Sequence, residues 1–162
     1  MRKNLKTQEN KFAKLIGYIS FIVMILFSCN KKEDRIKLMG RFNEEYEVDY
    51  RKDTIRIIFK NLESNFEDSL VCVKKLNDFY EIDNNDKRVF FSVNKDTVYS
   101  INDKGFTYKT EIKKVDKTVF KTSTILTNDM QEEVLLSSIF YDENYRIIKI
   151  EKQGLFTFYP QN

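Results

Sequence analysis

The sequence predicts an all-β fold, in which an antiparallel meander forms a curved sheet, half-barrel or small barrel after an N-terminal signal helix. Three observations lead to this prediction. Apolar residues after position 42 recur mostly with a period of two, which is typical of half-buried strands. Short Asn-, Asp- and Gly-containing turn signals separate these apolar runs. No stretch after residue 42 has a convincing helical period. We therefore expect a single β domain over residues 43–162.

The first 28 residues have the parts of a secretory signal peptide. Residues 2–14 form a basic start, and residues 15–28 form an uncharged core that is shorter than the roughly 20 residues of a membrane-spanning helix. The core ends in Leu26-Phe27-Ser28-Cys29. This motif resembles the lipobox of bacterial lipoproteins, although Phe27 is bulkier than the residue usually found there. Cys29 is therefore the residue for which the sequence indicates a specific chemistry.

The lipobox resemblance implies a defined maturation. The thiol of Cys29 receives a diacylglyceryl group, and a membrane peptidase cuts between Ser28 and Cys29. One acyl chain binds a bilayer only marginally, whereas two give a lasting anchor without a transmembrane helix. The alternatives are an uncleaved N-terminal anchor helix and an ordinary cleaved signal. The expected location is the outer membrane, with the protein held there through covalent lipid.

A charged segment, residues 30–34, follows the cysteine directly. Lys32, Glu33 and Asp34 resemble the export tag of Bacteroidota surface lipoproteins, and this resemblance implies display at the cell surface. The alternative is a charged tether on a protein that faces the periplasm. Residues 29–42 as a whole are expected to be the lipidated cysteine and a polar tether.

The basic balance of the chain comes from the leader. Residues 1–28 hold five bases and one acid, so the remainder has 28 − 5 = 23 bases and 25 − 1 = 24 acids, a net charge of −1. Lys and Glu or Asp alternate along this remainder, as in solvated faces. Nucleic-acid binding normally needs a basic patch or stripe, so we do not expect a nucleic acid as a partner.

About nine or ten strands with short connections are expected, and they pair mainly with their neighbours in sequence. The clearest runs are 54–60, 70–73, 79–82, 88–93, 97–101, 106–112, 119–126, 134–141, 145–150 and 155–159. Residues 61–69 are predicted to form a helical turn or a long loop, and residues 131–136 are ambiguous. The segment 140–150 resembles a YD-type hairpin of secreted bacterial β-proteins, with Tyr141-Asp142 before the turn and Arg146-Ile147 after it.

The predicted core is aromatic. One face of the alternating strands carries the core candidates Phe90, Phe106, Phe120, Phe140, Phe156 and Phe158. Cys72 has no cysteine partner in the mature chain if Cys29 carries lipid, so it is expected to behave as a small buried apolar residue. Four tyrosines are expected to be half-buried in the sheet, with a recognition surface as the alternative: Tyr46, Tyr50, Tyr99 and Tyr145.

The residue types of the mature chain exclude several kinds of catalysis. The chain has no His, and this excludes His-based triads and most zinc sites. Its four glycines are isolated, so there is no phosphate-binding loop. The turn 83–86 offers oxygen ligands to calcium but lacks the Gly and the distal Glu of a calcium loop. We therefore expect no catalytic residues, no metal and no cofactor.

Two functions agree best with these features. The first is a non-enzymatic binding or interaction module that is anchored to the envelope. The second is a carrier of a lipid or other apolar ligand in a half-barrel cavity, which requires a continuous apolar cavity. A hydrolase that uses carboxylates is a third hypothesis, and it requires two acids to meet in a cleft.

Overall fold

The computed structural model describes residues 34–83, 86–103, 106–128, 130, 132–154 and 156–161. Residues 34–162 form one compact unit. The predicted signal helix, Ser28, Cys29, Lys32 and Glu33 lie outside the described residues.

All regular structure in the described part of the chain is β. The twelve strands are β1 (Asp34–Met39), β2 (Glu44–Arg51), β3 (Thr54–Asn61), β4 (Phe66–Lys75), β5 (Asp78–Asp83), β6 (Asp86–Phe91), β7 (Thr97–Asp103), β8 (Phe106–Lys114), β9 (Val119–Thr127), β10 (Glu133–Asp142), β11 (Ile147–Lys152) and β12 (Phe156–Pro160).

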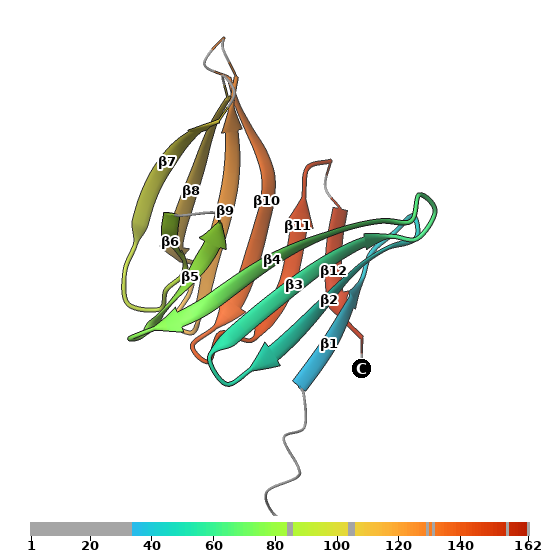
Figure 1. Cartoon of the computed structure of the whole chain (residues 1–162), viewed down its shortest axis with the longest axis horizontal. Coiled ribbons are helices and arrows are strands. Elements are labelled where there is room, and N and C mark those ends of the chain that lie inside the picture. The colour runs from blue at the N-terminus through green and yellow to red at the C-terminus, as the bar shows by residue number, and fades with distance from the viewer. Residues whose placement is uncertain are drawn as a thin grey trace, which may run out of the picture. The chain divides into compact units, whose positions relative to one another are not determined.

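The strands form one antiparallel sheet in the order β6-β5-β4-β3-β2-β1-β12-β11-β10-β9-β8-β7. Each half, β1–β6 and β7–β12, is a simple meander, because connections of a few residues favour pairing between consecutive strands. The halves are joined at one narrow place, where Leu38 lies opposite Pro160 and Met39 opposite Tyr159. The sheet curls into a half-barrel whose two edge strands are β6 and β7 (Figure 1).

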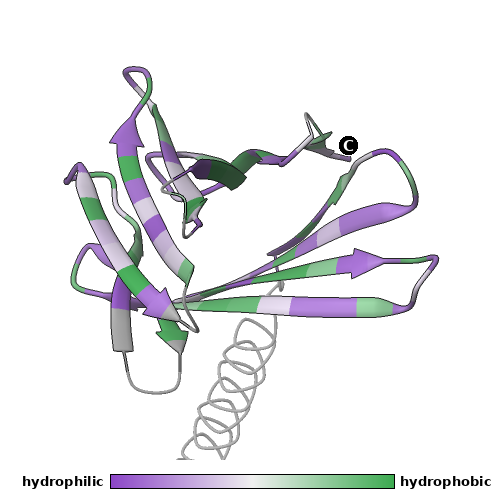
Figure 2. Ribbon diagram, turned by 90° about the horizontal axis from the view of Figure 1, so that it is seen from above, coloured by the Kyte–Doolittle hydropathy of each residue, from purple (hydrophilic) through white to green (hydrophobic). Residues whose placement is uncertain are grey.

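The concave face of the sheet holds the core. Hydrophobic and hydrophilic residues alternate along the strands (Figure 2), because successive side chains of a strand point to opposite faces. The fully buried side chains come from both halves of the sheet, and the largest apolar ones are Tyr141, Phe91, Phe158, Leu38, Ile55, Ile112 and Ile150. Core packing therefore holds the two halves together where strand pairing does little.

The predicted all-β half-barrel is confirmed, and the differences concern its N-terminal part. The tether ends earlier than expected, because Asp34–Met39 forms β1 against β2. The short alternation of Ile36 and Leu38 among charged residues was too weak a signal to predict a strand. Residues 61–69 are not a helical turn or a long loop. They contain the end of β3, a turn at residues 62–65 and the start of β4.

The core prediction is partly confirmed. Phe90, Phe120 and Phe158 are buried. The prediction that Phe106 is buried is wrong, because its side chain is 44% exposed at the start of β8. Phe140 and Phe156 are half-buried. The Phe140 ring lies 4.1 Å from the Lys149 ammonium and 5.9 Å from that of Lys121.

Two further sequence predictions, one about Cys72 and one about the segment 140–150, are confirmed. Cys72 is a free and buried thiol with 0% exposure. Burial raises its pKa far above the ordinary value of 9.0, which is the behaviour of an inert core cysteine. The segment 140–150 forms the β10–β11 hairpin, and Asp142 accepts hydrogen bonds from the backbone N–H groups of Asn144 and Arg146 at 2.8 Å.

Candidate ligand-binding cleft

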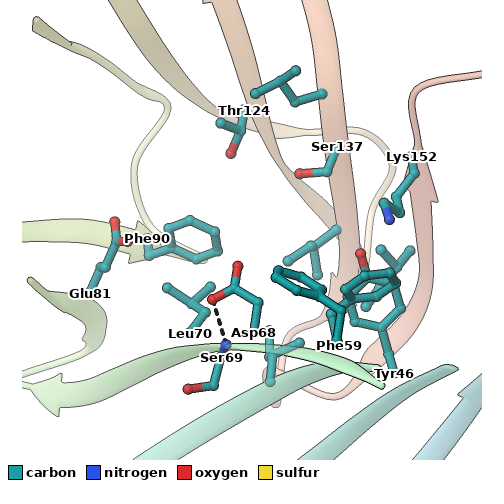
Figure 3. A pocket seen from close by; sticks show the side chains of 15 residues that line it. Tyr46, Phe59, Asp68, Ser69, Leu70, Glu81, Phe90, Thr124, Ser137 and Lys152 are labelled. Carbon is teal, nitrogen blue, oxygen red and sulfur yellow. Dashed lines mark hydrogen bonds between the residues drawn. The ribbon is translucent and has the colours of Figure 1, made fainter. Parts of the chain in front are cut away.

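An open cleft of about 550 Å³ lies between the two halves of the sheet (Figure 3). One wall comes from β2, β3 and β4, with Tyr46, Phe59 and Leu70 among its residues. The opposite wall comes from β9, β10 and β11, and Glu81 on β5 and Phe90 on β6 complete the lining from the first half. The volume of the cleft lies within the range of ligand pockets, which are concave, mainly apolar and provided with a few polar groups.

Two β-bulges supply apolar residues to the cleft. Phe90 is the extra residue in the pairing of β6 with β5, and Leu136 is the extra residue in the pairing of β10 with β9. A bulge breaks the alternation of side chains and re-aims one of them. Leu136 and Ser137, which are consecutive, therefore both line the cleft. Phe90 and Phe91 are both buried, with ring centroids 4.9 Å apart.

An aromatic cluster continues the wall that β2 and β3 form. Tyr46 contacts Phe158 edge-on at 4.9 Å between ring centroids and lies 5.2 Å from the ring of Phe59. Burial raises the pKa of Tyr46 far above its ordinary value of 10.0, with smaller contributions from Glu44 and Asp68. The Tyr46 hydroxyl therefore stays protonated at neutral pH and can donate a hydrogen bond.

Three charged residues border the apolar surface of the cleft. Lys152 extends from β11 over the ring of Phe59 on β3, with its Nζ 3.7 Å from the ring centroid and 3.8 Å from a carboxylate oxygen of Glu44. Asp68 lies opposite Phe59 in the β3–β4 register and accepts the backbone N–H of Ser69 at 2.8 Å. Glu81 lies 3.9 Å from the guanidinium of Arg88. The cleft therefore offers both signs of charge beside an apolar surface.

The carboxylate hypothesis requires two acids to meet in a cleft. Asp68 and Glu81 both line this cleft. However, Glu81 forms an ion pair with Arg88, and Asp68 lies opposite the aromatic residue Phe59 in the β3–β4 register. Their partners therefore favour roles in binding.

An aromatic cluster closes one end of the cleft. Tyr141 stacks on Tyr145 and Phe120 with ring centroids 5.9 Å apart in both pairs, and it contacts Phe91 edge-on at 4.9 Å. Tyr145 contacts Phe79 at 4.9 Å and donates a hydrogen bond to the backbone carbonyl of Asn77. These rings come from both halves, so they fix the spacing of the two cleft walls at this end.

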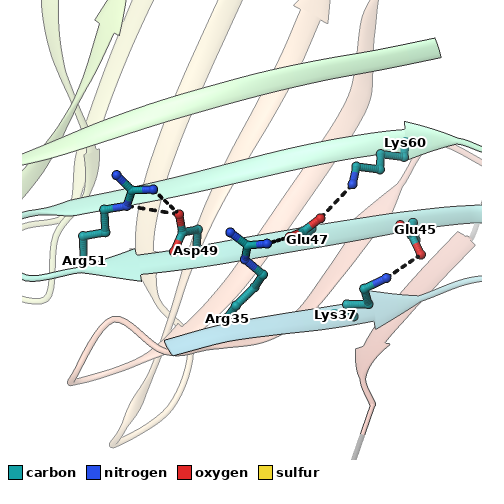
Figure 4. Close-up of polar contacts among 7 residues, drawn as sticks. All are labelled: Arg35, Lys37, Glu45, Glu47, Asp49, Arg51 and Lys60. Atoms are coloured by element: carbon teal, nitrogen blue, oxygen red, sulfur yellow. Dashed lines mark hydrogen bonds and ion pairs between the residues drawn. The ribbon is translucent and has the colours of Figure 1, made fainter. Parts of the chain in front are cut away.

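The outer face of β2 carries a row of acids. Glu45, Glu47 and Asp49 alternate with the inward-facing residues of the strand and are almost fully buried. Bases on the same and adjacent strands pair with them at the following N–O distances: Arg35–Glu47 2.8 Å, Lys60–Glu47 2.7 Å, Arg51–Asp49 3.0 Å and Lys37–Glu45 3.7 Å (Figure 4). The hydrogen bond from Lys60 is the main reason why the pKa of Glu47 is lowered. Opposite charges on neighbouring strands stabilise pairing, so we assign this row to the fold.

A second hollow, of about 600 Å³, lies over the joint between β1 and β12. It is lined by Gly40, Arg41 and Gly154 together with exposed side chains such as Met39 and Tyr159. The cleft between the halves is the better candidate because buried residues of both halves form its walls.

The structure locates only some of the residues that the sequence singled out. Asp34, the last residue of the predicted export tag, begins β1 and forms an ion pair with Arg146. Of the four tyrosines, Tyr46 and Tyr145 are buried, whereas Tyr50 and Tyr99 are half-buried. The turn 83–86 includes residues outside the described part of the chain. The described residues contain no group of three His, Cys, Asp or Glu positioned to hold a metal ion.

Apart from Tyr46 and Phe90, sequence reasoning missed the residues of the cleft. Leu136, Asp68 and Lys152 belong to strands far apart in the chain, and no local pattern links them. Asp68 interrupts the apolar face of β4 at the position opposite Phe59. This interruption was the one signal in the sequence that pointed to a polar group in the cleft. No helix of the described residues has the length and hydropathy to cross a membrane.

Comparison with known proteins gives no relative. No family model, no curated protein and no solved structure matches the chain.

Proposed function

We propose that the protein is a lipid-anchored envelope protein whose half-barrel binds a small amphipathic ligand in the cleft between its halves. The observation that carries this proposal is the open cleft of about 550 Å³ with aromatic and aliphatic walls. Of the two functions that the sequence favours, this one is the carrier of a lipid or other apolar ligand. The ligand has an apolar or aromatic body and a polar group.

Each part of such a ligand has a counterpart in the cleft. The apolar body lies against Phe59, Leu70 and Leu136, and its transfer from water contributes roughly 25 cal/mol per Å² of buried apolar surface. The polar group meets Asp68, the Tyr46 hydroxyl or Lys152 at the border. No step of this function requires a bond to be made or broken, so the proposed protein is a binder and not an enzyme.

A charge placed in the cleft is expected to abolish binding. Wild-type protein is titrated with N-phenyl-1-naphthylamine, an apolar probe that fluoresces out of water, and lipid that co-purifies with the protein is identified by mass spectrometry. The Leu136→Glu variant is expected to bind the probe at least about tenfold more weakly, which equals about 1.4 kcal/mol. The reason is that the new carboxylate would be desolvated on binding.

The neighbouring residue provides a matched control. Leu135 is 45% exposed and does not line the cleft, so Leu135→Glu makes the same chemical change one position away and is expected to bind like wild type. Circular dichroism shows whether both variants remain folded. Wild-type protein that neither binds the probe nor carries lipid would exclude the carrier function, and equal loss in the two variants would exclude the cleft as the site.

The anchor is tested separately at Cys29. Cells that express wild-type protein are expected to incorporate labelled fatty acid into it, and cells that express Cys29→Ala are not. Undiminished labelling of Cys29→Ala would remove the lipid anchor from the proposal and leave the cleft unaffected. Protease treatment of intact cells then tests surface display, which the Lys32-Glu33-Asp34 segment predicts.

A further inference from the structure

One end of the sheet, which we call the base, collects the start of β1 and five connections. These are residues 52–53, 76–77, 92–96, 115–118 and 143–146. Contacts of the 92–96 loop with the strand ends on either side place these connections together. Lys95 forms an ion pair with Asp78 at 3.6 Å, and Asp96 accepts the backbone N–H of Lys114 at 3.1 Å. The 92–96 loop therefore lies between the turns that carry Leu76 and Val115, in the lower left part of Figure 1.

Leu76 occupies an unfavourable position in the β4–β5 turn. Its side chain is 86% exposed, and its φ is +59°. Two-residue hairpin turns normally place glycine, asparagine or aspartate where φ is positive, and a Leu there costs energy through contact of its Cβ with the backbone. This Leu therefore contributes neither core packing nor favourable turn geometry. Backbone strain of this kind is concentrated where proteins function.

Val115 projects from the β8–β9 turn in a similar way and is 54% exposed. Each of these two apolar residues is flanked by exposed lysines: Lys74 and Lys75 before Leu76, and Lys113, Lys114 and Lys117 around Val115. Asp116, the one acid in the β8–β9 turn, lies between Val115 and Lys117 and accepts the backbone N–H of Lys117 at 2.6 Å. Apolar side chains that protrude among lysines match a membrane surface, where acyl chains lie below anionic headgroups.

The length of the chain before β1 limits what can reach the base. The expected lipid-bearing residue, Cys29, precedes Asp34 by five positions. Five residues span at most about 18 Å when fully extended. Asp34 itself lies at the base, because it is paired with Tyr50 in the register and with Arg146 through its carboxylate. A lipid on Cys29 would therefore hold the base near the bilayer.

We infer that the base is a membrane-docking surface, on which Leu76 and Val115 insert between lipid headgroups and the neighbouring lysines contact headgroup phosphates. This inference rests on the anchoring part of the proposed function. The rings of Phe79, Phe91 and Tyr141, which lie at the base ends of their strands, separate the cleft from the base. Docking of the base therefore orients the cleft away from the anchoring membrane, so that its ligand enters from the aqueous side.

Tryptophan fluorescence tests this orientation directly, because the chain has no Trp and each variant then carries a single indole. The variants Leu76→Trp, Val115→Trp and Leu62→Trp are purified as full chains and reconstituted into vesicles of phosphatidylethanolamine and phosphatidylglycerol. Leu62 is the matched control, since it is 51% exposed in the β3–β4 turn at the opposite end of its strands. Lipids brominated on their acyl chains serve as quenchers.

The Leu76→Trp and Val115→Trp variants are expected to show emission at shorter wavelength and to lose more than half of it to brominated lipid. The Leu62→Trp variant is expected to show neither effect. Reversal of Lys74 and Lys75 to Glu is expected to reduce quenching of the Leu76→Trp variant, whereas Arg41→Glu at the opposite end leaves it unchanged.

Two results would overturn the inference. One is equal quenching at positions 62 and 76. The other is a blue shift without quenching by lipid, because a second protein surface and not the bilayer then covers the base. The labelling of Cys29 is measured independently. A vesicle-bound protein whose Cys29 carries no lipid would contradict the proposed anchor while still reporting which end of the domain contacts lipid.

Discussion

Besides the hydroxyl of Tyr145, two further tyrosine hydroxyls connect the halves of the sheet at the scale of single residues. Tyr141 of β10 donates to the backbone carbonyl of Ser92 at 2.9 Å and accepts the N–H of the same residue at 3.1 Å. Tyr50 of β2 accepts the backbone N–H of Ile147 at 2.8 Å. Each bond joins segments that are far apart in the sequence. Removing a partner from a buried hydrogen bond costs about 1–3 kcal/mol, so these hydroxyls are important for the spacing of the cleft walls.

Burial predicts the pH at which this connection is lost. Desolvation raises the pKa of Tyr141 and of Tyr50 from 10.0 to about 12. Because the folded pKa lies above the unfolded one, the stabilising contribution of each hydroxyl is fully present below pH 10 and disappears as the pH rises toward 12. We expect the free energy of unfolding, measured by urea denaturation at a series of pH values, to fall across this interval.

Lysines and other tyrosines also titrate in this range, so a comparison of variants isolates the effect. Tyr141→Phe is expected to be less stable than wild type at neutral pH but to lose less further stability between pH 10 and 12. Tyr159→Phe is the control, because Tyr159 is 57% exposed, and it is expected to follow wild type. Equal slopes in the two variants would contradict the role assigned to Tyr141.

The joint between β1 and β12 is the critical contact at the scale of elements. Its register pairs Leu38 with Pro160 and Met39 with Tyr159, and one more bond runs from the N–H of Gln161 to the carbonyl of Lys37 at 2.9 Å. Pro160 has no N–H to donate. Side-chain packing therefore has to compensate for short backbone pairing. Phe158, with 0% exposure, packs beside Gly40 at this joint.

Gly40 permits this packing because it has no side chain. A Cβ at position 40 would lie 2.3 Å from the Cε1 atom of Phe158, whose ring is fully buried and packs against Tyr46. Gly40→Ala is expected to lower the free energy of unfolding by about 1–3 kcal/mol, as overpacked cores do, in urea denaturation. The neighbouring Arg41→Ala removes an exposed side chain and is expected to have little effect. A Gly40→Ala variant as stable as wild type would contradict this prediction, because it would show that β1 and β12 can move apart without loss of stability.

The whole molecule has different properties at its two ends. The aromatic cluster around Tyr141 closes one end, where the chain enters at Asp34 and where Leu76 and Val115 are exposed among lysines. Beyond the cluster, the halves separate and leave the cleft. The proposed ligand site on one side of the cluster and the proposed docking surface on the other agree with a protein that is held at a membrane and receives its ligand from solution.

The sequence by itself determined the class of the fold, because the alternation of side chains and the spacing of turns are local properties. It predicted the hairpin around Asp142 for the same reason, and it predicted the buried state of Cys72 from the lack of a cysteine partner in the mature chain. It also predicts the anchor at Cys29, which remains to be tested. Strand β1 was not predicted, because two apolar residues, Ile36 and Leu38, carry its whole pattern and its stability comes from β2.

Only the tertiary structure decided how the sheet closes and where the cleft lies. The pairing of β1 with β12, the bulges at Phe90 and Leu136, and the approach of Lys152 to Phe59 all join residues distant in sequence. Phe106 was misplaced because a period of two identifies a face but not which strand ends project beyond the core. Local patterns specify which residues form strands, whereas the curl of the completed sheet determines which of their side chains meet across it.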